Sequence, residues 1–166
     1  MQDKTYNVLV LCTGNSARSI FGEALFNALG RGKFIAYSAG SKPAGRVNPF
    51  ALELLQQRGR DIAALRSKSW DEFAAADAPE IDFIFTVCDS AAGENCPAWP
   101  GKPTTAHWGI SDPVEVEGGD EIRRAAFRKA YEQLARRIQL FMSLPIEKVD
   151  KLTLKRKLAE IGRTQD

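Results

Sequence analysis

The strongest constraint on the fold is a regular alternation of short apolar runs with segments whose apolar residues recur at helical spacing. Residues 8–11, 34–37 and 81–87 are such runs, and residues 105–108 are a candidate for a short fourth strand. Continuous apolar runs of this length are typical of strands that are buried on both faces of a sheet. Strands that alternate with helices predict an α/β fold with a mainly parallel sheet.

Four helices are predicted between and after these runs. One helix covers residues 20–29, and a second opens with Asn48 as its cap and Pro49 in its first turn. A long helix begins at Glu121, and an amphipathic helix follows Pro145. The predicted buried stripes are Ile122, Ala126, Ala130, Leu134, Ile138 and Phe141 in the long helix, and Val149, Leu152, Leu158 and Ile161 in the last one.

Length and composition fit a single globular domain. The chain has 166 residues, of which 44% are hydrophobic and 27% charged, as in ordinary soluble proteins with one core. We expect residues 1–144 to form this domain. Residues 145–166 are expected to form a helical extension that packs on the same domain or on a partner.

Charge and cysteine content narrow the classes of function. A net charge of +2 does not favour nucleic-acid binding, and no apolar run approaches the roughly 20 residues that cross a membrane. The polar N-terminus does not resemble a signal peptide, so we expect a cytoplasmic protein. Three cysteines are too few for a disulfide scaffold. In a cytoplasmic chain such cysteines favour catalysis or metal binding.

Residues 12–18, with the sequence Cys-Thr-Gly-Asn-Ser-Ala-Arg, connect the first strand to the first helix, and we call them the oxyanion loop. Ligands of open α/β sheets bind beyond the carboxyl ends of the strands. Amides at a helix N-terminus attract anions, and Gly14 and Asn15 tolerate the left-handed backbone of an anion-binding nest. The guanidinium of Arg18 matches two oxygens of a tetrahedral anion. The residues predicted to bind the oxyanion are Thr13, Gly14, Asn15, Ser16, Ala17, Arg18 and Ser19.

Cys12 is the predicted nucleophile of this loop. The helix dipole and Arg18 are expected to lower the pKa of its thiol below the ordinary value of about 8.5. Ser16 and Ser19 are candidates to donate hydrogen bonds to the thiolate, although Ser19 is also a candidate cap for the helix. The alternative interpretation is a buried, inert cysteine beside a surface arginine.

Residues 11–19 resemble the active-site motif of low-molecular-weight tyrosine phosphatases and of the arsenate reductases that share their fold. The resemblance extends through residues 37–40, 86–88 and 108–113, and covers roughly residues 6–142. It implies a four-stranded parallel sheet flanked by helices, with the oxyanion loop as the active site.

Cys88 and Cys96 distinguish the reductase from the phosphatase. No flavin or nicotinamide motif is visible, so thiols are left as the source of the two electrons that arsenate reduction needs. The resemblance implies that Cys88 attacks arsenylated Cys12 to release arsenite, and that Cys96 then attacks Cys88. An external thiol, either thioredoxin or glutaredoxin with glutathione, would reduce the enzyme, with no bound cofactor. Arsenate is the expected ligand, with phosphate or sulfate as its mimic.

Other interpretations of these thiols stay open. Cys88 and Cys96 are also explained as two small buried apolar residues. A zinc site would use Cys12, Cys88, Cys96 and His107, but these spacings match no zinc module, and we predict no metal and a strand position for His107. A protein that is not an enzyme would use the thiols to bind trivalent arsenic or to sense oxidants.

Asp112 is the candidate general acid, since Pro113 holds the backbone before it extended and the segment follows a predicted strand. A turn formed by Ser-Asp-Pro is the alternative. Tyrosine phosphatases of this fold usually carry a tyrosine after Asp-Pro, whereas this chain has Val114. The favoured function is therefore arsenate reduction for arsenic detoxification. A phosphatase that hydrolyses phosphate monoesters through a phosphocysteine is the alternative.

A potassium site is matched only in part by this sequence. Some arsenate reductases of this family hold potassium with an asparagine, a glutamate, a serine and an aspartate. Asn15, Glu23 and Ser38 match three of these residues. The fourth position falls near Lys68, whose ammonium group would take the place of the cation.

Overall fold

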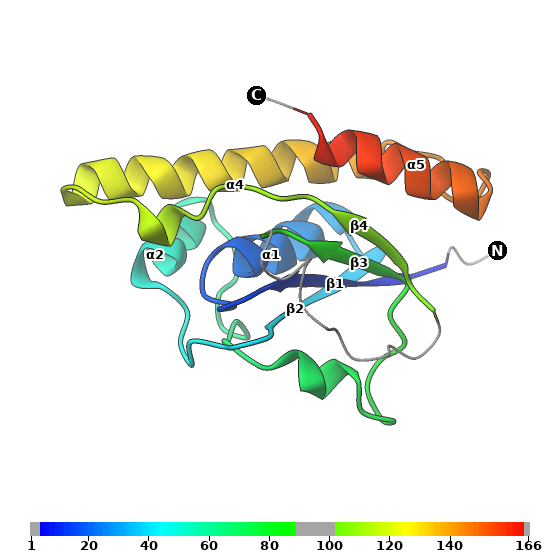
Figure 1. Ribbon diagram of the computed structural model, residues 1–166, viewed down its shortest axis with the longest axis horizontal. Helices are drawn as coiled ribbons and strands as arrows, with labels where there is room; N and C mark the ends of the chain where they lie inside the picture. The colour runs from blue at the N-terminus through cyan, green and yellow to red at the C-terminus, as the bar shows by residue number, and fades with distance from the viewer. Residues whose placement is uncertain (1–3, 89–101, 165–166) are drawn as a thin grey trace.

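The structure is a computed structural model, and it describes residues 4–88 and 102–164. Its sheet contains β1 (Tyr6–Cys12), β2 (Phe34–Gly40), β3 (Phe83–Thr86) and β4 (Thr104–His107). All neighbouring strands are parallel, in the order β2-β1-β3-β4 (Figure 1). The predicted four-stranded parallel sheet is confirmed.

The helices follow the predicted pattern. They are α1 (Arg18–Gly30), α2 (Pro49–Gln57), α4 (Asp120–Met142) and α5 (Lys151–Gly162), with short 3-10 helices η1 (Trp70–Phe73) and η2 (Pro113–Glu115). The predicted cap of α2 is present, because the Asn48 side chain accepts a hydrogen bond from the backbone N–H of Phe50 at 2.9 Å. Neither 3-10 helix was predicted, since segments of three or four residues carry no period.

The central strand β1 is buried on both faces. Val8 and Val10 face the main core, which the helices close, and Leu9 and Leu11 face a smaller cluster. Figure 1 shows α4 and α5 along one side of the sheet. The smaller cluster on the other side includes residues of η1. Burial on both faces explains the continuous apolar run.

Several strand ends differ from the sequence prediction, among them the end of β2 and the start of β3. β2 extends to Gly40, beyond the predicted end at residue 37, because β1 pairs with it as far as Cys12. β3 begins at Phe83 instead of residue 81. The carboxylate of Asp82 accepts a hydrogen bond from the backbone N–H of Asn7 at 2.8 Å, which fixes the chain just before this strand.

Two residues of the predicted buried stripes are exposed. Ile122, in the first turn of α4, is 58% exposed, and Leu152 of α5 is 79% exposed. The buried residues of α5 are Leu154, Leu158 and Ile161, spaced four and three positions apart. Leu152 precedes Leu154 by two positions and therefore points away from this face.

Helix α5 contacts β4 and α4 of the same chain. The indole Nε1–H of Trp108 donates to the carbonyl of Leu158 at 2.9 Å, and both side chains are fully buried. The division of the chain at residue 144 stays a prediction. No helix in the two described stretches is both long and apolar enough to cross a membrane.

Candidate active site

The oxyanion loop leaves the carboxyl end of β1 and enters α1, and it borders a cavity of about 290 Å³. The cavity is lined by Cys12, Thr13, Gly14, Ser16, Ala17, Arg18, Asp112, Val114 and Glu115. The structure thus brings the predicted nucleophile, arginine and acid to one cavity. Val114 and Glu115 also line it, although sequence reasoning did not assign Glu115 a place there.

Asn15 shapes the loop from within. Its backbone has φ of 47°, in the left-handed region, and its side chain is fully buried. The amide Nδ2–H groups donate to Ser19 Oγ at 2.7 Å and to Ser38 Oγ at 3.0 Å. Asparagine tolerates this backbone conformation better than most residues, as the sequence analysis predicts.

The carbonyl groups of the loop are satisfied by the segment that follows β2. Those of Thr13, Gly14 and Ser16 accept from the backbone N–H groups of Lys42, Ala44 and Asn48 at 2.9, 2.8 and 2.9 Å. Because these carbonyl oxygens accept hydrogen bonds from the segment after β2, their negative charge is satisfied outside the cavity. This arrangement suits a loop whose amides receive an anion.

Gly40, at the end of β2, lies directly against the loop. A Cβ atom added there would be 2.3 Å from the carbonyl oxygen of Thr13. Movement of a side chain could not relieve this clash, because the contacted atom belongs to the backbone. The close approach of β2 to the loop therefore requires glycine.

Cys12 is 3% exposed, and its Sγ lies 2.9 Å from Ser19 Oγ. The backbone N–H of Asn15 donates to the same sulfur at 3.2 Å. Ala17 occupies the cap position of α1, so Ser19 lies inside the helix and does not cap it. Two roles were considered for Ser19, a cap of α1 or a hydrogen-bond partner of Cys12. The structure shows the contact with the sulfur.

The expected lowering of the Cys12 pKa is not found. Burial raises the pKa of this thiol, and the hydrogen bonds with Ser19 and Asn15 only oppose that effect. A negative charge on Cys88 would raise the pKa further. Desolvation disfavours the charged thiolate. The guanidinium of Arg18 was expected to stabilise the thiolate, but it interacts with other groups.

Arg18 connects α1 to the segment between β4 and η2. Its NH2 lies 3.3 Å from Asp112 Oδ2, and its NH1 donates to the carbonyl of Ile110 at 3.0 Å. The second carboxylate oxygen of Asp112 accepts from the backbone N–H of Val114 at 3.0 Å. Asp112 therefore forms the turn and also faces the loop. Ile110 was not predicted, since a backbone acceptor has no sequence pattern.

Cys88 follows β3 and is buried. Its Sγ lies 3.5 Å from the hydroxyl of Thr13, the residue after Cys12. β1 and β3 are parallel neighbours, so both cysteines lie at the same edge of the sheet. Cys96, the third predicted redox residue, lies outside the described residues.

Asn15, Ser38, Glu23 and Lys68 form a buried polar cluster. The Ser38 hydroxyl donates to Glu23 Oε1 at 2.6 Å, and Lys68 Nζ lies 3.5 Å from the same oxygen. The backbone N–H of Lys68 donates to Asn15 Oδ1 at 2.9 Å. Burial lowers the pKa of Lys68, an effect that Glu23 opposes. The ammonium group already pairs with the glutamate, so this cluster does not fit a potassium ion.

His107 has the predicted strand position, as the last residue of β4, and its Nδ1 lies 2.8 Å from the hydroxyl of Thr86. The zinc alternative included Cys96 and so extends beyond the described residues. Within the described stretches, no three His, Cys, Asp or Glu side chains are grouped to hold a metal ion.

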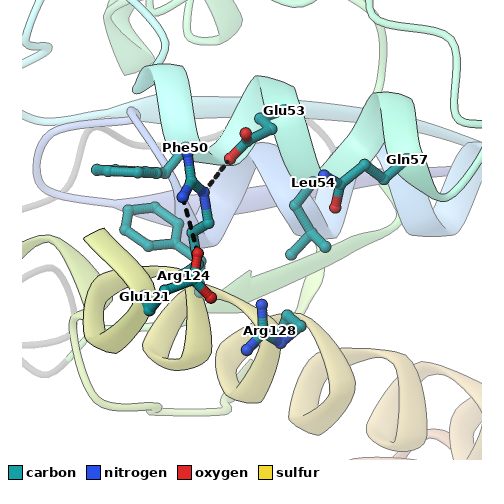
Figure 2. Close-up of a pocket in the computed structure, with 8 residues that line it drawn as sticks. Phe50, Glu53, Leu54, Gln57, Glu121, Arg124 and Arg128 are labelled. Carbon is teal, nitrogen blue, oxygen red and sulfur yellow. Dashed lines mark hydrogen bonds and ion pairs between the residues drawn. The ribbon is translucent and has the colours of Figure 1, made fainter. Parts of the chain in front are cut away.

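A larger cavity, of about 440 Å³, lies between α2 and α4. Figure 2 shows Arg124 between Glu53 and Glu121, which it contacts at 2.9 and 3.0 Å. No cysteine of the described stretches lines this cavity, and Arg124, one of its two arginines, is already paired with carboxylates. The smaller cavity at the oxyanion loop therefore remains the candidate active site on chemical grounds.

Known arsenate reductases resemble this chain in sequence, and solved ones resemble it in fold. The arsenate reductase of Halalkalibacterium halodurans is 36% identical over 134 residues, which cover 81% of this chain and 93% of that protein. A solved arsenate reductase in the phosphate binding state has 27% identity and a TM-score of 0.62, covering 81% of this chain and 98% of that one. The thioredoxin-dependent arsenate reductase of Corynebacterium glutamicum has 27% identity and a TM-score of 0.53, covering 84% and 65%.

The family model for low molecular weight phosphotyrosine protein phosphatases matches residues 7–157 of this chain. This match includes the oxyanion loop, Cys88, Asp112 and all four strands except the first residue of β1. The sequence resemblance, the parallel sheet and this match agree. The chain belongs to the low molecular weight phosphotyrosine protein phosphatase family.

Proposed function

We propose that this protein is a cytoplasmic arsenate reductase that converts arsenate to arsenite in arsenic detoxification. The observation that carries the proposal is the pair of buried thiols, Cys12 and Cys88, at one edge of the sheet beside an oxyanion loop. Relatives named arsenate reductase support the choice of substrate. A relative in a phosphate binding state supports capture of a tetrahedral oxyanion by this fold.

In the first step the proton of the Cys12 thiol passes to the Asp112 carboxylate, directly or through the bound arsenate, and the Cys12 thiolate attacks arsenic. A sulfur–arsenic bond forms and an arsenic–oxygen bond breaks. Arg18 and the amides of the oxyanion loop hold the remaining oxygens. Asp112, 3.3 Å from Arg18, donates its proton to the leaving hydroxide, which departs as water. General acid catalysis of this kind contributes about 10²–10⁴-fold to a rate.

In the second step Cys88 attacks the sulfur of Cys12. A disulfide forms between the two cysteines, the sulfur–arsenic bond breaks, and its electron pair stays on arsenic. Arsenic(V) is thereby reduced to arsenic(III), and arsenite leaves. The Thr13 hydroxyl, 3.5 Å from Cys88 Sγ, is positioned to donate a hydrogen bond to the attacking thiolate.

In the third step Cys96 attacks Cys88, and Cys12 leaves as a thiolate. The resulting Cys88–Cys96 disulfide is then reduced by an external dithiol, so no bound cofactor is needed. The Corynebacterium glutamicum relative is thioredoxin-dependent, which supports thioredoxin as the reductant. Glutaredoxin with glutathione is the alternative reductant.

A second candidate function is hydrolysis of phosphate monoesters. The family match and the pairing of Arg18 with Asp112 favour it. Cys12 would attack phosphorus, Asp112 would protonate the leaving alcohol, and water would hydrolyse the phosphocysteine. Val114 lines the cavity where the phosphatases usually carry a tyrosine, so an aryl phosphate would lack an aromatic wall. We expect this activity to be weak.

Arsenate turnover by the wild type, Cys88→Ser and Cys96→Ser tests the relay. The wild type should consume reducing equivalents only when arsenate is present. Cys88→Ser should release no arsenite and keep slow ester hydrolysis. Cys96→Ser should release one arsenite per enzyme and then stop, because its Cys12–Cys88 disulfide is not passed on.

Thioredoxin and glutaredoxin systems are supplied separately, and urea unfolding of each variant serves as the control for folding. Equal arsenate turnover by the wild type and Cys88→Ser would contradict the relay. Ester hydrolysis without any arsenate turnover by the wild type would favour the phosphatase instead.

A further inference from the structure

Residues 108–112 connect β4 to η2 and carry the general acid, and we call them the acid segment. Three consecutive carbonyls of this segment accept guanidinium N–H groups. Arg137 NH1 donates to Trp108 O and Gly109 O, both at 3.1 Å, and Arg18 NH1 donates to Ile110 O at 3.0 Å. The two arginines therefore fix successive peptide planes just before Asp112.

Arg137 lies on α4 and is 7% exposed. Arginine is seldom buried to this degree unless its donors are used. Its second guanidinium nitrogen, NH2, donates to the carbonyl of Thr164 at 3.2 Å. One side chain thus joins the acid segment to the residues that follow α5. The planar fork of arginine suits such a bridge, because its donors have fixed directions.

The end of α5 is pressed against the beginning of the same segment. A Cβ atom added to Gly162 would lie 2.4 Å from His107 O and 2.8 Å from Trp108 Cδ1. The Trp108 indole N–H also donates to Leu158 O at 2.9 Å. The last turns of α5 therefore pack against the start of the acid segment.

We propose that Arg137 is a positioning residue for Asp112, an inference that rests on the proposed role of Asp112 as the general acid. The hydrogen bonds of Arg137 described above go to backbone carbonyls and not to Cys12, Cys88 or Asp112. It holds the peptide planes of Trp108 and Gly109, which set the direction of the Ile110 carbonyl. That carbonyl in turn orients Arg18 toward the carboxylate of Asp112. Small errors in the position of a catalytic group lower rates, by about 10²-fold for 1 Å.

Arg137→Lys tests this proposal, because lysine keeps the charge and removes the fork. Arg128→Lys, on an exposed position of the same helix, is the matched control. We expect Arg137→Lys to lower kcat for arsenate by about tenfold or more, with KM changed much less. Arg128→Lys should match the wild type in both constants.

The double variant Arg137→Lys/Asp112→Asn separates positioning from general damage to the fold. If Arg137 acts through Asp112, the double variant should be no slower than Asp112→Asn alone, because the two losses share one cause. Losses that multiply would overturn the proposal. Wild-type kcat in Arg137→Lys would overturn it as well.

Hydrogen exchange of the amides in residues 108–112 provides a measurement that needs no turnover. Exchange should be faster in Arg137→Lys than in the wild type and unchanged in Arg128→Lys. Equal exchange in Arg137→Lys and the wild type would overturn the positioning role. If the wild type does not reduce arsenate, the proposed function fails separately, and the same variants are compared by ester hydrolysis, which also uses Asp112.

Discussion

Two opposing effects act on the pKa of the Cys12 thiol. Burial raises the pKa of its thiol, whereas the Ser19 hydroxyl and the Asn15 amide favour the thiolate. Burial is the larger effect, so it raises the pKa of Cys12 above that of an ordinary thiol. The hydrogen bonds limit this cost and are therefore expected to control reactivity.

Ser19→Ala should raise the pKa of Cys12 further, because it removes the hydroxyl 2.9 Å from the sulfur. Alkylation of Cys12 by iodoacetamide, followed by mass spectrometry across pH 7 to 11, would measure the change. Ser143→Ala, at the end of α4 and outside the lining of the cavity, is the matched control. A Ser19→Ala profile that coincides with the wild type, or shifts to lower pH, would show that Ser19 does not stabilise the thiolate.

At the scale of elements, α5 shows how packing overrides a simple hydrophobic pattern. Leu158 is fully buried and its carbonyl accepts from Trp108, but Leu152 on the same helix is 79% exposed. The spacing of apolar residues predicted one buried stripe that includes both leucines. The contacts of α5 with α4 and β4 select one face, which starts at Leu154.

Leu158→Ala should lower the free energy of unfolding by about 2–5 kcal/mol, since it leaves a cavity in a buried contact. Leu152→Ala makes the same chemical change at an exposed position and should change stability by less than about 0.5 kcal/mol. Urea unfolding followed by fluorescence measures both. Equal effects of the two substitutions would mean that α5 does not pack on the domain through this face.

At the scale of the whole molecule, the buried thiol links stability to pH. The folded-state pKa of Cys12 is raised above the ordinary value for a thiol, so the folded protein retains a proton that the unfolded chain loses. This contribution to stability is fully present below that ordinary value. It is lost as pH rises through the higher folded-state pKa.

Wild type should therefore lose stability relative to Cys12→Ser as pH rises from 8 to 10.5, because serine does not titrate there. Lys68 also has a shifted pKa, but it is present in both proteins and cancels in the difference. Urea unfolding at each pH provides the comparison. A difference that stays constant with pH, or grows in favour of the wild type, would contradict a raised pKa.

The order of the elements and the location of the site follow from local sequence. Apolar runs and helical spacing predicted all four strands and the four helices, because both signals arise from neighbours along the chain. The motif of residues 12–18 predicted the oxyanion loop, and the left-handed backbone at Asn15 agrees with it. Asp112 and Cys88 were predicted by their places after strands.

Only the tertiary structure decided which groups meet across the sheet edge. The contacts of Arg18 with Ile110 and of Arg137 with Trp108 join residues far apart in sequence, and backbone acceptors leave no pattern in side chains. The tertiary structure also decided the direction of the Cys12 pKa shift. Local sequence pointed to the helix dipole and Arg18, but the largest effect on this pKa is the depth of burial, which depends on the whole fold.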